Sequence, residues 1–374
     1  MTAPDDELRA RFDETIPGRE SPRGHYGSPS ILAMDGLARQ RHFTSGAAKP
    51  PAVHHLFGLT PTRASPGRAT FSAPASPWLL GTAGVFHGGV APMVADAPLS
   101  SSVITELGPN QIVTTAALSF DFVRPADPSA GRIVAESTSE HVGRNLGLSS
   151  CEVTDAAGRL LAYGIARHVV LSIDPEEQAS DVDPTQQVPV DEAATYDGPD
   201  PWERPVEGEV LSPELWDRPG LELAEAWCAD ELPRPPYQVL TGCTPVDCRE
   251  GWVRWIAPAS GWWCSPAPYL YGGMLAMFAE STLSAAFTTV SPAGRVAAVV
   301  DLNVRFLRPV FPDGGVLDAQ AEVVHAGRNL RVATCEIHDG RGKLAVLAEA
   351  SAVLVPPTFF SDAASGDAEL PTDP

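Results

Sequence analysis

Apolar residues in the later half of the chain recur with the period of an α-helix. In the stretch GMLAMFAESTLSAAFT, Leu275, Phe278, Ala279, Leu283 and Ala286 follow three-and-four spacing. This spacing predicts a helix with one continuous apolar face.

An earlier stretch has the same character but contains two prolines. Pro92 is compatible with a first helical turn, whereas Pro98 removes an interior hydrogen bond and bends a helix. We therefore expect the second half of this earlier helix to be bent or interrupted.

Each helical stretch is followed by segments with strand character. In the earlier half these segments are rich in β-branched and apolar residues, and they span 112–124, 131–142, 145–155 and 160–171. Asp155-Ala-Ala-Gly158 reads as a hairpin turn in which glycine supplies a positive φ. Before the helix, His54–Thr60 and Ala69–Ala73 suggest a further short strand pair. One helix followed by a four-stranded antiparallel meander predicts an α+β unit whose sheet wraps the helix.

The two halves are related by a constant offset of 184 residues. HGGVAPMVAD begins at His87 and YGGMLAMFAE begins at Tyr271, and the same offset carries His141–Leu146 onto His325–Leu330. Between 87 and 171 the copies share 26 identities in 85 aligned positions. A long period present only twice indicates two copies of one domain, which we place at 29–171 and 213–355.

The formal charge of −21 lies mostly outside the repeats. The Pro-rich segment 172–212 has a net charge of −11, residues 1–28 have −2, and residues 356–374 have −4, which leaves −4 for the two repeats together. Such acidic segments of low hydrophobicity are typical of solvated chain. We therefore predict a disordered N-terminal arm at 1–28, a linker at 172–212 and a disordered tail at 356–374.

Composition excludes several classes of function. The sequence has no basic stripe, which argues against a nucleic-acid partner. No run of about 18 apolar residues is present, and the charged N-terminus is unlike a signal peptide, so we expect no membrane span and a cytoplasmic protein. Six cysteines without a CxxC pair or a matched histidine spacing argue against a zinc site.

The ordered motifs of each repeat resemble those of a known family. In the first copy these are Gly84-x-x-His87-Gly-Gly, a helix with an acid nine residues after the histidine, Phe122-Val-Arg-Pro125, His141-x-Gly-Arg144 and Asp155-x-x-Gly158. The set is similar to that of the hotdog-fold thioesterases, most closely the phenylacetate-pathway (PaaI-like) branch. The resemblance implies hydrolysis of acyl-CoA or acyl-carrier thioesters without a metal or other cofactor. It also implies a double hotdog, in which an intramolecular pair replaces the usual homodimer; association of such chains into a homo-oligomer stays open.

The resemblance further implies two composite sites, each built from both copies. One would pair Asp96 with Tyr271-Gly272, and the other would pair Glu280 with His87-Gly88. Free N–H groups at a helix start can polarise a thioester carbonyl, a role that fits Gly88-Gly89 and Gly272-Gly273. The alternative is that these glycines only allow a tight turn or close packing.

Asp96 and Glu280 are the strongest single candidates for chemistry. Each is the only carboxylate in a helical stretch of small and apolar residues, where an unpaired buried charge is costly. A carboxylate so placed can activate water or attack the thioester, and the alternative is a solvent-facing acid.

Further polar positions differ between the copies. Ser100 and Ser284 lie four residues after the acids, hence on the same helix face, and are either water-orienting hydroxyls or small packing residues. The family's polar position 27 residues after the motif histidine is Thr114 in the first copy and Ala298 in the second. We therefore expect the Asp96 site to be the better equipped one.

The remaining candidates have weaker signals. His87 is replaced by Tyr271 in the second copy, so we interpret it as a residue that positions the turn. A direct role in the reaction is equally open. Four arginines either meet CoA phosphates at the rim or form structural ion pairs; they are Arg124, Arg144, Arg308 and Arg328. Two other functions stay open: a non-enzymatic acyl-thioester binder, and a hydratase or dehydratase acting on a carrier-bound intermediate.

Overall fold

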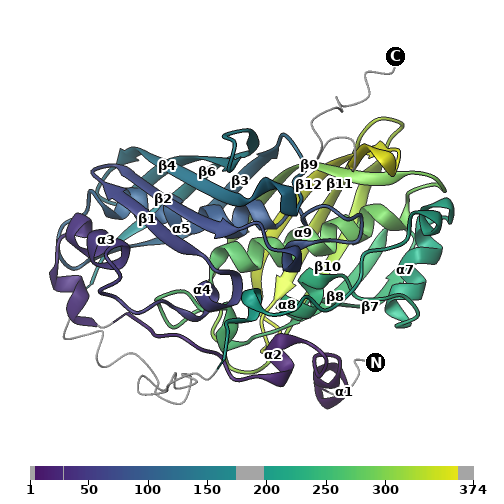
Figure 1. Ribbon diagram of the computed structural model, residues 1–374, viewed down its shortest axis with the longest axis horizontal. Coiled ribbons are helices and arrows are strands. Elements are labelled where there is room, and N and C mark those ends of the chain that lie inside the picture. The colour runs from purple at the N-terminus through teal and green to yellow at the C-terminus, as the bar shows by residue number, and fades with distance from the viewer. Residues whose placement is uncertain (1–4, 28, 174–197, 361–374) are drawn as a thin grey trace.

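The protein folds as two similar halves that share one continuous sheet (Figure 1). The computed structural model describes residues 5–27, 29–173 and 198–360. Within them, twelve strands form a sheet in the order β1-β2-β4-β5-β6-β3-β9-β12-β11-β10-β8-β7. The helices α5 (Val90–Ile104) and α9 (Gly272–Thr289) lie side by side against this sheet, one in each half. The α+β double-hotdog architecture expected from the sequence is confirmed.

The first repeat contains α3 (Gly36–Thr44), α4 (Ala52–Phe57), β1 (Thr60–Ser65), β2 (Arg68–Pro74), α5, β3 (Gln111–Phe122), β4 (Arg132–Val142), β5 (Leu146–Asp155) and β6 (Leu160–Ser172). The second contains α7 (Gly220–Cys228), α8 (Pro236–Thr241), β7 (Thr244–Arg249), β8 (Trp252–Pro258), α9, β9 (Val296–Phe306), β10 (Val316–Ala326), β11 (Arg331–His338) and β12 (Leu344–Val355). Short 3₁₀ helices lie between these helices and strands, at Pro29–Ala33, Pro77–Leu79, Pro128–Ala130, Pro201–Glu203, Pro213–Asp217 and Gly261–Trp263.

The halves are joined where β3 pairs with β9 in antiparallel register. Ser119 lies opposite Asn303, its own counterpart in the other copy, and the serine hydroxyl donates to the asparagine carbonyl at 2.5 Å. Because equivalent positions face each other, the pseudo-two-fold axis passes through this pair. This arrangement places α5 of the first half next to α9 of the second half.

Two local predictions were wrong. The segment His54–Thr60 is not a strand, because Ala52–Phe57 forms α4, which ends at Gly58 with a φ of 67°. The four strands after the helix also do not form a simple meander: β3 crosses to pair with β6, so it is free to pair with β9 on its other side.

Helix α5 continues through Pro98 and is not interrupted. The N–H of the adjacent Ala97 donates to the Tyr271 hydroxyl at 2.5 Å. A partner from the other repeat thus satisfies a donor next to the proline, where the regular helical hydrogen-bond ladder is weakened.

The N-terminal arm is not disordered over 5–27, contrary to the prediction for 1–28. It contains α1 (Asp5–Ala10) and α2 (Ile16–Arg19). Leu8 and Phe12 are buried against Ile256 of the second repeat. Their four-residue spacing gives a short apolar stripe, which a charge count over the segment does not detect. Residues 1–4 and 28 lie outside the described residues.

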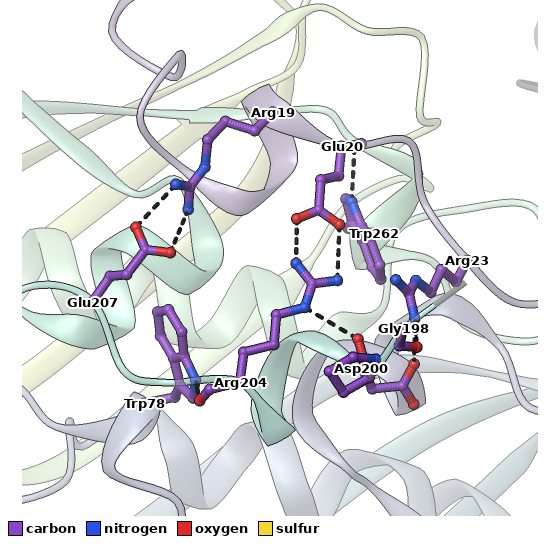
Figure 2. A network of polar contacts seen from close by, with 10 residues as sticks. Arg19, Glu20, Arg23, Trp78, Gly198, Asp200, Arg204, Glu207 and Trp262 are labelled. Atoms are coloured by element: carbon purple, nitrogen blue, oxygen red, sulfur yellow. Dashed lines mark hydrogen bonds and ion pairs between the residues drawn. The ribbon is translucent and has the colours of Figure 1, made fainter. Parts of the chain in front are cut away.

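The end of the linker is fastened to this arm (Figure 2). Arg204 forms a two-pronged ion pair with Glu20, and Arg19 pairs with Glu207. Buried Trp78 and Trp262, which are equivalent in the two repeats, donate their indole N–H groups to the backbone carbonyls of Arg204 and Glu20. Residues 198–212 are therefore part of the folded protein, whereas 174–197 lie outside the described residues.

Residues 356–360 of the tail also contact the fold. Phe360 joins a cluster with Leu211, Trp216 and Leu223, while 361–374 lie outside the described residues. No helix in the described part of the chain is long and apolar enough to cross a membrane.

Candidate active site

Each central carboxylate lies at the start of the other repeat's helix. Oδ2 of Asp96 accepts the N–H of Gly273 at 2.9 Å, and Oε2 of Glu280 accepts the N–H of Gly89 at 3.3 Å. The predicted pairing of each acid with the opposite Gly-Gly turn is confirmed. Asp96 and Glu280 are both buried, so neither is a solvent-facing acid.

Glu280 has three hydrogen-bond donors around its carboxylate, which leaves one acceptor position. Its Oε2 lies 2.7 Å from Nε2 of His87, and its Oε1 accepts the Ser284 hydroxyl at 2.8 Å. Burial favours a raised pKa for Glu280, but His87, Ser284 and the N–H of Gly89 outweigh burial and lower the pKa below its usual range. The carboxylate is therefore ionised at neutral pH.

The hydrogen bonds of His87 define which ring nitrogen carries the proton. The N–H of Gly89 donates to Nδ1 at 3.1 Å, so Nε2 carries the proton that is shared with Glu280. The ring also stacks on Tyr237, with centroids 4.1 Å apart, and its Nε2 lies 3.1 Å from the Ser281 hydroxyl. These contacts place His87 next to the carboxylate rather than only in the turn.

Asp96 has different surroundings. The Thr115 hydroxyl donates to its Oδ1 at 3.0 Å, and the Tyr271 ring fills the place that His87 takes in the other half. Burial raises the pKa of Asp96 to about 6, against the opposing effects of Thr115 and Gly273. Asp96 is therefore half protonated near pH 6 and mostly ionised at pH 7.

The prediction that Thr114 would face Asp96 was wrong by one residue. The pairing of β3 with β6 is irregular between Thr115 and Ala117, and this bulge turns Thr115 inward while Thr114 is exposed. Ser100 contacts the Thr115 hydroxyl at 3.3 Å rather than Asp96 itself.

Thr115 belongs to a polar chain that exists only in the first repeat. Its hydroxyl lies 3.5 Å from Nδ1 of His168, whose Nε2 lies 3.0 Å from Ser149. Burial lowers the pKa of His168 to about 4, so its ring is neutral. The equivalent positions in the second repeat are occupied by Val299, Ala352 and Ala333.

The four glycines allow two different close approaches. A Cβ on Gly88 would lie 2.8 Å from Oε1 of Glu280, and one on Gly272 would lie 2.8 Å from Oδ2 of Asp96. A Cβ on Gly89 or Gly273 would instead meet the backbone of the opposite helix, at 2.6 Å from Met277 and 2.9 Å from Met93. The first glycine of each pair makes room for the carboxylate, and the second permits α5 and α9 to pack closely.

A cavity of about 230 Å³ reaches Glu280. Its walls come from both repeats, and Asp96 is not among the lining residues. The lining includes Gly88, His87, Arg124, Tyr237, Gln238, Trp255, Glu280, Ser281 and Ser284, with Trp216 and Trp227 from the second repeat and Phe359 and Phe360 from the tail. The N–H of Gly88 donates to no backbone acceptor within the described ranges, so it is free to polarise a group in the cavity.

Of the predicted arginines, only Arg124 lines this cavity. Its guanidinium also donates to the carbonyl of Leu160 at 3.0 Å. Arg144, Arg308 and Arg328 are exposed at the surface and do not line the cavity.

Several polar residues of the site were missed at the level of sequence. Tyr237, Gln238 and Ser281 line the cavity, Thr115 contacts Asp96, and His168 contacts Thr115. Comparison of the copies could have found four of them, because the counterparts of Tyr237, Ser281, Thr115 and His168 are Val53, Ala97, Val299 and Ala352. A polar residue replacing an apolar one at a buried repeat position is such a signal.

Comparison with known proteins agrees with the architecture. Residues 83–162 and 267–346 each match the family model described as thioesterase superfamily. Each repeat therefore contains a segment that is similar to the thioesterase superfamily, and the two segments lie in tandem. Comparison with curated protein sequences gives no significant match.

Solved structures with the same arrangement are distant in sequence. The tesB protein of Mycobacterium avium subspecies paratuberculosis is 15% identical with a TM-score of 0.52, and the match covers 82% of this chain and 98% of that one. A hot dog fold protein of unknown function from Alicyclobacillus acidocaldarius is 13% identical with a TM-score of 0.51 and the same coverage. AziG of S. sahachiroi is 35% identical over 33% of this chain and 98% of its own, with a TM-score of 0.31. The first two share the fold.

Proposed function

We propose that the protein hydrolyses acyl thioesters, with CoA or a carrier protein as the thiol part, at the site formed by Glu280, His87 and Gly88. The observation that carries this proposal is that an ionised, buried carboxylate and an unpaired helix-terminal N–H both face one cavity. Thioester hydrolysis requires these two groups, a base and an electrophilic donor.

The proposed reaction uses side chains, backbone and water. Glu280 removes a proton from water, and the oxygen adds to the thioester carbonyl carbon. The N–H of Gly88, near the positive end of α5, stabilises the negative charge that develops on the carbonyl oxygen. The C–S bond then breaks, and the proton held by Glu280 passes to the departing thiolate.

His87 and Ser284 would keep Glu280 in its ionised form and in position. Both donate hydrogen bonds to the carboxylate. Because Nδ1 of His87 is occupied by the Gly89 N–H, the ring is a donor to Glu280 and not a second base.

We assign the Asp96 half a structural role. Its carboxyl group has a raised pKa, the cavity that reaches Glu280 does not include it, and the Tyr271 ring packs beside it. This assignment reverses the expectation that the Asp96 site is the better equipped one.

A thiol-release assay over a panel of acyl-CoA substrates tests the proposal. Glu280→Gln keeps the shape of the side chain and should lower kcat by roughly 10²–10⁴-fold. Asp96→Asn is the matched control at the equivalent position and should retain most of the activity.

Two results would contradict the proposal. Strong loss in Asp96→Asn with little loss in Glu280→Gln would move the reaction to the other half. Binding of acyl-CoA without any thiol release by the unaltered protein would favour a non-enzymatic acyl-thioester binder.

A further inference from the structure

Gln238 places an unpaired hydrogen-bond acceptor at the cavity. The side chain lies in α8, is 3% exposed, and lines the cavity that reaches Glu280. Its Oε1 has no hydrogen-bond partner among the described residues. Leaving a buried carbonyl unpaired is costly, and native proteins rarely do so without a ligand, a water molecule or a functional reason.

One hydrogen bond engages the nitrogen end of the amide. The Nε2–H of Gln238 donates to the Tyr237 hydroxyl oxygen at 3.4 Å. The nitrogen end of the amide is thus engaged, and Oε1 is left to accept from another group.

The position of Gln238 within the cavity indicates which part of a substrate it would meet. Lining residues such as Val123, which is 53% exposed, mark the open side, where the CoA or carrier portion must reach solvent. Gln238 lines the same cavity and is buried, as are the lining residues Ile133, Val153 and Trp255, so these four residues lie away from solvent. An acyl group in the cavity would contact such buried lining residues.

We propose that Gln238 is a specificity-determining residue that accepts a hydrogen bond from an O–H or N–H group on the acyl chain. The preferred substrates are then thioesters whose acyl group carries a hydroxyl or amino substituent, and plain acyl groups leave the buried acceptor unpaired. This inference rests on the proposed function. The first copy lacks this role, because the residue equivalent to Gln238 there is His54, whose ring packs edge-on against Phe71.

Matched substrate pairs provide the test. Thiol release is measured for hexanoyl-CoA against its hydroxyhexanoyl isomers, and for phenylacetyl-CoA against its hydroxyphenylacetyl isomers. The unaltered protein should prefer at least one hydroxylated member by roughly tenfold or more in kcat/KM. Gln238→Met, which keeps the length of the side chain without its polar end, should abolish that preference and improve the plain partner. His54→Met, at the equivalent position, is the control and should leave the preference unchanged.

The outcomes separate this inference from the proposed function. No thiol release by the unaltered protein from any substrate would overturn the proposed function and this inference with it. Thiol release without a preference for any donor-bearing acyl group would overturn only the inference. An equal loss of kcat on both members of a pair in Gln238→Met would also overturn it, since that result assigns Gln238 to the attacking water.

Discussion

Nε2 of His87 and Oε2 of Glu280 lie 2.7 Å apart, although the first residue precedes the helix of one repeat and the second lies within the helix of the other. The contact joins the two copies, and the other half of the protein cannot repeat it. There Tyr271 occupies the position of His87, and Asp96 occupies the position of Glu280. The duplication has therefore produced two different half-sites on one scaffold. The chemical difference between them can be measured.

The first prediction concerns the pH dependence of hydrolysis. His87→Phe keeps a ring that can stack on Tyr237 but removes the hydrogen bond to Glu280. Because burial raises the pKa of Glu280 and His87 lowers it, loss of His87 should raise this pKa. The base works when ionised, and activity is lost as pH falls through that pKa. The acidic limb of the profile of kcat/KM against pH should therefore move to higher pH.

Tyr271→Phe is the control for that experiment, because it alters the equivalent position of the other half. Its acidic limb should coincide with that of the unaltered protein. A His87→Phe profile that also coincides would show that the histidine does not set the ionisation of Glu280.

The second prediction concerns stability and uses Asp96. Burial raises its pKa from 3.8 to about 6, so the folded state holds the proton more tightly than the unfolded state. The stability linked to this proton is fully present below pH 3.8 and is lost as pH rises through about 6. Asp96→Asn does not ionise, and its free energy of unfolding relative to the unaltered protein should improve by up to about 3 kcal/mol across that window.

Glu280→Gln should behave in the opposite way. The folded-state pKa of Glu280 is lowered, so its ionisation contributes stability above the unfolded-state pKa that is lost as pH falls through the folded-state pKa. Urea denaturation at a series of pH values measures both variants. Parallel pH dependence of the two variants would contradict the different environments assigned to the two acids.

Much of this arrangement was accessible from the sequence because the repeat preserves spacing. The constant offset located both helices and both Gly-Gly turns, and the resemblance to the hotdog thioesterases implied the exchange of acids between the halves. Local periodicity located β3 to β6 within a residue or two. These features depend on residues near one another in the chain, or on equivalence between copies.

The predictions failed where contacts between distant parts of the chain determine which side chain faces a site. Whether Thr114 or Thr115 faces Asp96 depends on a bulge in the pairing with β6, which no local pattern announces. We propose the reverse ranking of the two sites because His87 and the cavity reach Glu280 through contacts between the repeats, which the sequence does not show. The composition of the N-terminal arm and the linker also did not predict the packing of Phe12 or the ion pair between Arg204 and Glu20.

The third prediction separates the two roles of the glycine pairs. Gly88→Ala brings a methyl group to 2.8 Å from Glu280, so it should lower kcat with a small change in stability. Gly89→Ala brings a methyl group against the α9 backbone at Met277, where neither side can yield easily, and should cost about 1–3 kcal/mol of stability.

The second repeat offers the matched controls. Gly273→Ala should destabilise the protein as Gly89→Ala does, whereas Gly272→Ala should leave kcat nearly unchanged because it crowds Asp96. Thiol release and urea denaturation of the four variants give the comparison. Equal loss of kcat in Gly88→Ala and Gly272→Ala would indicate two working sites.

The fourth prediction concerns the N-terminal arm, which the charge pattern assigned to disordered chain. Phe12 is 5% exposed and packs with Leu8 against Ile256, so Phe12→Ala should cost about 3 kcal/mol of the free energy of unfolding. Arg204→Met, which breaks a partly exposed ion pair with Glu20, should cost only about 1 kcal/mol. Arg218→Met removes a more exposed pair with Glu222 and serves as the control, with a change within about 0.5 kcal/mol. Denaturant unfolding measures all three, and an unaltered midpoint in Phe12→Ala would mean that the arm does not stabilise the second repeat.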